Sequence, residues 1–255
     1  MFATATKRSA LTSDHGQPKS RILVLDIVRV VALLAMVIFH FVFDLELYGH
    51  VSAGTTGAGF WRGVAVFSAS SFVFLAGVGL WLSHRYGIRW AAFSRRLAIL
   101  LIAAAAVSIA TSIVFPDQFV FFGILHSIAL CSILGLAFLR LPVLIIAVLA
   151  VVVFVAPNFA TSTAFDSPWL WWTGLQTVPL RTVDYEPIFP WFAAFLAGMA
   201  VAKLASHLGL WEMLSTNTSY RGLGALTFFG RHTLIVYFIH QPILISVVWA
   251  GTILF

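Results

Sequence analysis

Long apolar runs separated by short polar stretches dominate the chain from residue 21 onward. The first run begins at about residue 21, and six more cover about residues 58–83, 92–115, 118–139, 141–157, 187–206 and 232–254. Runs of roughly 20 apolar residues are long enough to cross the hydrocarbon core of a bilayer as helices. The pattern therefore predicts an all-α, polytopic membrane helix bundle with about seven transmembrane spans, in a single domain over residues 21–255.

Three stretches do not fit a simple span. Residues 1–20 are polar and predict a disordered cytoplasmic tail, and because no small-residue cleavage site follows them, the next run should remain as the first span. Residues 158–186 contain Pro168-Trp-Leu-Trp-Trp172, which is too short to cross and is typical of an interfacial or re-entrant piece anchored by Trp. Residues 207–231 are rich in glycine and predict a cytoplasmic connection with one amphipathic helix.

Composition supports the membrane interpretation. Hydrophobic residues make up 61% of the chain, charged residues only 9%, and there are 24 Phe, which is far more apolar than a soluble domain of this length. The single cysteine, Cys131, lies in an apolar run. The sequence therefore excludes a disulfide framework and a cysteine metal site, and no metal is expected.

The basic residues are distributed unevenly between the connections. With the tail in the cytoplasm, only Arg62 and Arg181 fall on the outer side, and the inner side receives Arg85, Arg89, Arg95, Arg96, Arg140, Lys203, Arg221 and Arg231. Cytoplasmic connections of membrane proteins are enriched in Lys and Arg, so the N-terminus is predicted inside and the C-terminus outside. The net charge of +6 is thus an orientation signal, and a nucleic-acid partner is not expected.

The first span carries four ionisable side chains: Asp26, Arg29, His40 and Asp44. Helical spacing puts them on one face, with Arg29 and His40 about 16 Å apart along the axis. Ionisable groups inside a membrane usually face a protein interior or a cavity and mark a working site. Asp26 with Arg29 could instead be a structural ion pair. A carboxylate one turn from a histidine, as Asp44 is from His40, is the arrangement of a general base.

Other polar residues fall at depths that would bring them near this span. His126 lies about a third of the way into the fourth run, and His232, His240 and Gln241 belong to the last. His126 could simply hydrogen-bond across a helix interface, and His232 could anchor the membrane boundary. The outer mouth of the sixth run is expected to hold Asp184, Tyr185 and Glu186.

Several motifs together resemble a known family. Arg29 and His40, in a first span that opens with Asp26, resemble the signature of acyltransferase-3-type membrane enzymes. More specifically, four separated motifs resemble bacterial members of the heparan-α-glucosaminide N-acetyltransferase catalytic-domain family, over roughly residues 21–250. They are Phe39-His-Phe-Val-Phe-Asp44, Phe122-Gly-Ile-Leu-His126, Asp184-Tyr-Glu-Pro-Ile-Phe-Pro-Trp191 and Gly230-Arg-His-Thr-Leu-Ile-Val-Tyr-Phe-Ile-His-Gln-Pro242.

The resemblance implies transfer of an acetyl group from cytoplasmic acetyl-CoA to a sugar amine or hydroxyl at the outer side of a bacterial inner membrane. It implies catalysis by His40, with Asp44 orienting it and His126 at the reacting centre. The donor would be held by Arg29, with Asp26, His232 and His240, and the acceptor would meet Asp184, Tyr185, Glu186 and His50. His50 lies near the position of a histidine discussed as catalytic in lysosomal relatives, so the choice between His40 and His50 stays open.

Other outcomes remain open at this point. O- and N-acetylation, direct transfer and an acetyl-histidine intermediate, and a monomer and a homodimer are equally compatible with the residues. A transporter or lipid-handling protein is the alternative function, although an odd number of dissimilar spans argues against inverted repeats. A b-type haem would need two opposed axial ligands from His40, His126 and His240.

Overall fold

The computed structural model describes residues 21–216, 228–230 and 232–254. The predicted tail and residues 217–227 of the predicted inner connection lie outside these ranges. The long helices are α1 (Leu23–Leu47), α2 (Gly59–His84), α3 (Trp90–Val114), α7 (Ile188–His207) and α10 (Thr233–Leu254). Shorter ones are α4 (Ile124–Gly135), α5 (Val143–Val155), α6 (Pro157–Ala160) and α8 (Leu210–Leu214). A two-residue antiparallel ladder joins β1 (Arg21–Ile22) to β2 (Ser215–Thr216).

The predicted helical membrane bundle is confirmed. Within the described ranges, five helices are long and apolar enough to cross a bilayer: α1, α2, α3, α7 and α10. The helix α5 has 13 residues, and α4 continues into the short 3₁₀ turn η2 (Leu136–Phe138). Helices of this length are shorter than the hydrocarbon core is thick, so the count of seven spans remains a prediction.

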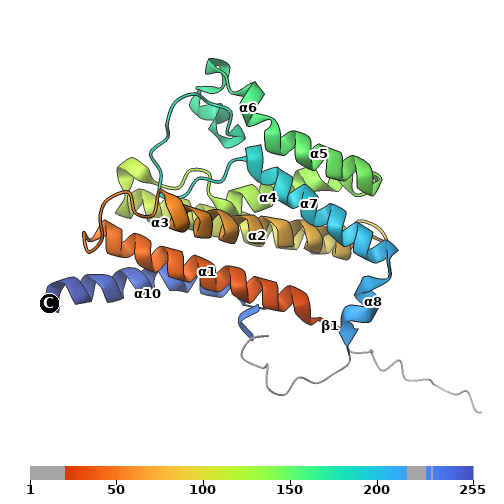
Figure 1. Ribbon diagram of the computed structural model, residues 1–255, viewed down its shortest axis with the longest axis horizontal. Coiled ribbons are helices and arrows are strands. Elements are labelled where there is room, and N and C mark those ends of the chain that lie inside the picture. The colour runs from red at the N-terminus through yellow and green to blue at the C-terminus, as the bar shows by residue number, and fades with distance from the viewer. Residues whose placement is uncertain (1–20, 217–227, 231, 255) are drawn as a thin grey trace, which may run out of the picture.

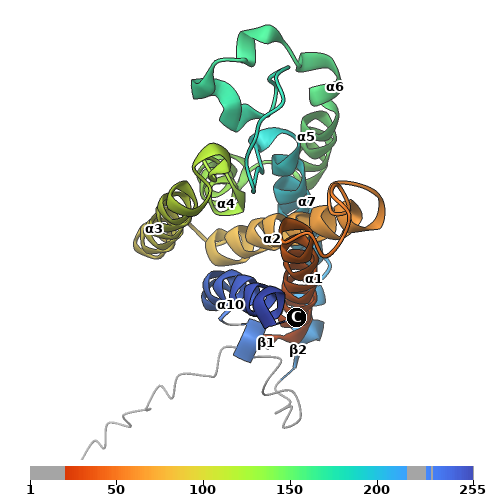
Figure 2. The same ribbon diagram turned by 90° about the vertical axis from the view of Figure 1, so that its left-hand side faces the viewer.

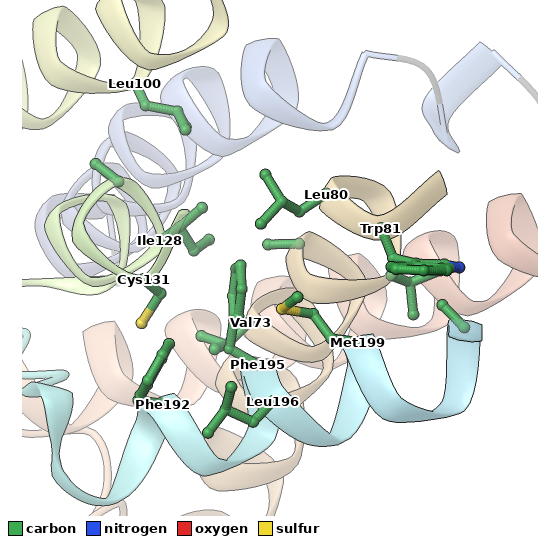
Figure 3. Close-up of a cluster of buried hydrophobic side chains, with 14 of the residues drawn as sticks. Val73, Leu80, Trp81, Leu100, Ile128, Cys131, Phe192, Phe195, Leu196 and Met199 are labelled. Atoms are coloured by element: carbon green, nitrogen blue, oxygen red, sulfur yellow. The ribbon is translucent and has the colours of Figure 1, made fainter. Parts of the chain in front are cut away.

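The helix α2 lies at the centre of the bundle, with α1, α4 and α7 packed around it (Figures 1 and 2). The close-up in Figure 3 shows Phe195 and Met199 of α7 meeting Val73 and Leu80 of α2. Both Phe195 and Leu80 are fully buried. This layer of interdigitated side chains forms the core, and α5 packs on the far side of α7.

Glycines allow α2 and α7 to approach closely. A Cβ added to Gly77 would collide with the backbone carbonyl of Phe195, and one added to Gly198 would collide with that of Phe74. Small residues at such positions let helix backbones come together in membranes, where van der Waals contact drives association. The α2–α7 interface therefore requires glycine on both of its helices.

The helices α1 and α10 run side by side in the same direction (Figure 1). At one end Gly230, just before α10, lies against Asp26 of α1. At the other end the Nε2 atom of His50 lies 2.8 Å from the Thr252 hydroxyl. Two parallel spans must have an odd number of spans between them, as α1 and α10 would have in a bundle of seven.

The predicted span over residues 118–139 is wrong in its first third, because only residues from Ile124 onward are in α4. Before it the backbone is extended and pairs with the loop that precedes α7. The N–H of Val183 donates to Gln118 O at 2.9 Å, and that of Glu186 donates to Phe122 O at 3.1 Å. These hydrogen bonds satisfy backbone groups that a helix would have used, and they fix the loop against the start of α4.

The tryptophan-rich stretch predicted to be interfacial, residues 168–172, lies in the 3₁₀ turn η4 (Pro168–Thr173), which follows another such turn, η3 (Thr163–Phe165). The carboxylate of Asp166 accepts hydrogen bonds from the N–H and hydroxyl of Thr177, which closes the segment on itself. The indole of Trp169 is 87% exposed, as an interfacial side chain would be, although its place relative to lipid stays a prediction.

Candidate active site

A cleft of about 630 Å³ is lined by residues of α1, α2, α3, α4 and α10. Three arginines line one region of it: Arg29 of α1 and Arg95 and Arg96 of α3. Most of the remaining wall is apolar, and it includes Phe72, Leu75, Leu100, Leu125 and Ile128. The cleft also reaches the first residue of α4, Ile124, and the phenol of Tyr237 on α10.

The arginines place positive charge along one region of this cleft. Arg29 donates to the carboxylate of Asp26 at 2.7 Å, so the structure contains the ion pair that the sequence left as an alternative. Arg96 lies within electrostatic reach of Arg29, and no carboxylate among the described residues pairs with Arg95 or Arg96. Guanidinium groups without a carboxylate partner suit phosphate oxygens, which they bind through paired hydrogen bonds.

Two histidines meet at the contact between α1 and α10. The rings of His40 and His240 lie 5.0 Å apart, centre to centre, in an edge-to-face arrangement. The Nδ1 atom of His240 lies 2.8 Å from the carbonyl of Tyr237, so this nitrogen carries the proton and Nε2 is left as an acceptor. His240 Nε2 and His40 Nδ1 are both buried, and neither has a partner within the described part of the chain.

The predicted hydrogen bond between Asp44 and His40 is not formed. Asp44 is 0% exposed, and its Oδ1 atom instead accepts from Gln241 Nε2 at 2.8 Å. Gln241 projects from α10 toward this carboxylate. Its hydrogen bond to Asp44 therefore replaces the contact with His40 that the spacing within α1 predicts. Asp44 therefore ties α1 to α10, and its second oxygen, Oδ2, is buried without a partner in the described ranges.

Two carboxyl groups lie in the loop before α7. Asp184 accepts from the backbone N–H of Ile124 at 3.1 Å and so caps the start of α4, where a negative charge is favoured. Burial nevertheless raises the pKa of Asp184 to about 6. Burial and the charge of Asp184 raise the pKa of Glu186 well above its ordinary value, and Glu186 Oε2 is buried with no partner among the described residues.

Four other predicted site residues have structural partners. The ring nitrogens of His126 face the N–H of Gly123 at 3.3 Å and the Ser108 hydroxyl at 3.5 Å, which is the helix-interface alternative. The hydroxyl of Tyr185 donates to Trp171 O at 2.6 Å, and burial raises its pKa to about 12. His50 is exposed and bound to Thr252, and the Nδ1 atom of His232 lies 2.9 Å from Phe228 O.

The geometry also bears on the haem alternative. His40 and His240 are in direct ring contact, so no porphyrin fits between them as axial ligands would require. Among the described residues, no three His, Cys, Asp or Glu side chains gather as a metal-binding group.

Sequence reasoning gave no individual role to Arg95, Arg96, Gln241 or Tyr237. The sequence predicts Arg95 and Arg96 as inner basic residues that could join Arg29 at the donor phosphates, but it does not single them out from the other inner arginines. Gln241, immediately before Pro242 in an apolar run, was noticed for its polarity alone. For Tyr237, one tyrosine among many aromatic residues, the sequence contains no comparable signal.

Comparison with known families identifies a matching family. The family described as "Heparan-alpha-glucosaminide N-acetyltransferase, catalytic" matches residues 21–242. That range covers α1 through the first half of α10, and so it includes the arginine-lined cleft and both histidines of the ring pair. Neither the curated proteins nor the solved structures gave a match.

Proposed function

The chain belongs to the heparan-α-glucosaminide N-acetyltransferase catalytic-domain family and is a membrane acetyltransferase, and we propose that it moves acetyl from cytoplasmic acetyl-CoA to a sugar amine or hydroxyl at the outer side. One observation carries the proposal. A single cleft joins three arginines to Tyr237, whose ring lies 5.9 Å from that of His240 in the histidine pair. A donor bound in this cleft would place its charged nucleotide at the arginines and its thioester near Tyr237, beside the histidine pair.

The donor's phosphates are assigned to Arg29, Arg95 and Arg96. A guanidinium binds phosphate oxygens through two parallel hydrogen bonds, and the low dielectric of the surrounding helices strengthens each of them. The pantetheine arm then lies along the apolar wall, with Leu100 and Ile128 among its contacts. The separation of Arg29 and His40, about 16 Å along α1, is a distance that such an arm can span.

His40 is assigned as the general base. It takes the proton of the acceptor as the oxygen or nitrogen attacks the thioester carbonyl, and it returns that proton to the departing thiolate of CoA. His240 contacts its ring and holds it in place. The bond from Gln241 to Asp44 fixes α10 against α1, so Asp44 acts by positioning both histidines.

The acceptor is assigned to the loop with Asp184 and Glu186. Among the described residues, buried polar atoms without a partner lie on α1, on α10 and in this loop: Asp44 Oδ2, Gln241 Oε1, His240 Nε2 and Glu186 Oε2. Buried acceptors without donors are costly, and a ligand rich in O–H or N–H groups would satisfy them. A sugar offers such groups in quantity. Tyr185 contributes by holding this loop to Trp171.

The direct test is transfer of label. Purified protein in detergent is given radiolabelled acetyl-CoA with D-glucosamine or with N-acetylglucosamine, which offers hydroxyls alone. Label on the first probe only indicates N-acetylation, and label on both indicates O-acetylation. Failure to bind acetyl-CoA would overturn the proposed function.

The proposed sidedness places the N-terminus in the cytoplasm of a bacterial inner membrane, as the arginine asymmetry and the resemblance to bacterial proteins suggest. Tyr86, in the turn after α2, and Arg181, in the loop before α7, are both exposed. In a Cys131→Ala background, Arg181→Cys should react with an impermeant thiol reagent in intact cells and Tyr86→Cys should not. The reverse labelling would overturn the orientation.

A further inference from the structure

Tyr237 lies where the donor cleft meets the polar cluster. Its side chain lines the cleft that contains the arginines. Its ring lies 5.9 Å from that of His240, which in turn contacts His40. The carboxyl groups of Asp184 and Glu186 are within electrostatic reach of its phenol. Tyr237 thus lines the cleft proposed for the donor, contacts the histidine that packs on the proposed base, and lies near the carboxyl groups of the proposed acceptor loop.

The hydroxyl of Tyr237 is also uncommitted. In the described part of the chain it makes no hydrogen bond, whereas Tyr185 donates to the carbonyl of Trp171. Tyr237 is half-buried and lines the cleft, so its hydroxyl is available to a ligand bound there. A phenol is protonated at neutral pH and can donate a hydrogen bond.

The Tyr237 hydroxyl can donate a hydrogen bond, unlike several unpartnered polar atoms on α1 and α10. The unpartnered atoms Asp44 Oδ2 and Gln241 Oε1 are acceptors, and His240 Nε2 is one as well because its Nδ1 faces a carbonyl. None of them can stabilise negative charge on a reacting oxygen. Acyl transfer needs such stabilisation, because the carbonyl oxygen becomes an oxyanion in the transition state.

We propose that Tyr237 is a catalytic residue whose hydroxyl donates a hydrogen bond to the thioester carbonyl oxygen of the acyl donor. The inference rests on the proposed function. The acceptor's lone pair forms a bond to the carbonyl carbon, its proton passes to His40, and the C=O π pair moves to the oxygen held by Tyr237. That pair then re-forms the C=O bond as the C–S bond breaks, and the thiolate takes the proton from His40. Acetylated acceptor and CoA thiol are the products.

The test compares Tyr237→Phe with Tyr86→Phe. The first keeps the ring contact with His240 and removes only the hydroxyl, and the second removes a hydroxyl from a side chain that is 90% exposed in the turn after α2. Both are assayed with radiolabelled acetyl-CoA and the two glucosamine probes, and acetyl-CoA binding is measured on the same samples. Removing one oxyanion donor typically lowers kcat about 10²–10³-fold.

We expect Tyr237→Phe to lose turnover by about that factor with the Kd for acetyl-CoA unchanged, and Tyr86→Phe to behave as the wild type. Unchanged donor binding also shows that the variant is folded. Wild-type turnover in Tyr237→Phe, or a loss confined to donor affinity, overturns the assignment while the proposed function stands. A wild-type chain that acetylates neither probe overturns both.

Discussion

Two helix pairs in this protein are packed in opposite ways. Between α2 and α7, Gly77 and Gly198 bring the backbones into contact, and apolar side chains such as Phe195 fill the rest. Between α1 and α10 the contacts are polar: Asp44 with Gln241, and His40 with His240. The first pair leaves no room for a ligand, and the second borders the cleft.

The difference separates stability from chemistry. Close apolar packing gives α2 and α7 a large number of van der Waals contacts, which is the main source of helix association in lipid. The unpartnered polar atoms of the second pair cost free energy that this packing must offset. Changes at α2–α7 should therefore affect unfolding, and changes at α1–α10 should affect turnover.

The largest expected effect is that of His40→Ala. Loss of a general base typically lowers the rate about 10²–10⁴-fold, and because α2–α7 is untouched, the midpoint of thermal unfolding should stay near that of the wild type. An acetyl-transfer assay in detergent measures the rate, and thermal unfolding in the same detergent measures the midpoint. His50→Ala, at an exposed site bound to Thr252, is the matched control. Activity retained in His40→Ala but lost in His50→Ala would transfer the role to His50.

The next effect concerns the arginine end of the cleft. Arg29→Ala should weaken acetyl-CoA binding by one to two orders of magnitude, since a charge-assisted hydrogen bond contributes about 1.5–3 kcal/mol. Arg62→Ala, at an exposed position near the start of α2, is the control. Isothermal titration of detergent-solubilised protein gives the two affinities. Equal affinity for both variants would leave Arg29 as a structural partner of Asp26 alone.

Gly198→Ala should act on the other pair. The added methyl group would meet the backbone carbonyl of Phe74, so α2 and α7 must separate, and overpacking of this kind costs about 1–3 kcal/mol. Gly63→Ala, with nothing near its added Cβ, should be neutral or slightly stabilising. Thermal unfolding compares them. Equal midpoints would show that the bundle does not depend on this close approach.

The smallest effect is a pH dependence. Burial raises the pKa of Asp184 from 3.8 to about 6, so the folded protein holds this proton more tightly than the unfolded chain does. Its contribution to stability is complete below about pH 4 and is lost as the pH rises through about 6. Asp184→Asn keeps an acceptor for the N–H of Ile124. Between pH 4 and pH 7 the unfolding midpoint of this variant should fall less than that of the wild type, by a difference of a few degrees. If the unfolding midpoints of the variant and the wild type changed equally with pH, Asp184 would not be the source of the pH dependence.

The sequence predicted those features that depend on one helix at a time. Apolar length located α1, α2, α3, α7 and α10 within a few residues, and spacing within α1 put Arg29 and His40 on a common face. Features that depend on two segments were missed. The residues around Gln241 do not indicate that it binds Asp44 in place of His40. The apolar residues before Ile124 predict a helix, although their backbone pairs with the loop before α7.

The parallel pairing of α1 with α10 also sets an order of assembly. The residues joined by the Asp44–Gln241 hydrogen bond are 197 positions apart, and ribosomes make α1 first and α10 after every other described helix. A nascent chain can therefore bury α2 against α7 while His40 still lacks its partner histidine. The histidine pair proposed for catalysis exists only once synthesis has passed α10, so incomplete chains that reach the membrane carry a formed core without this pair.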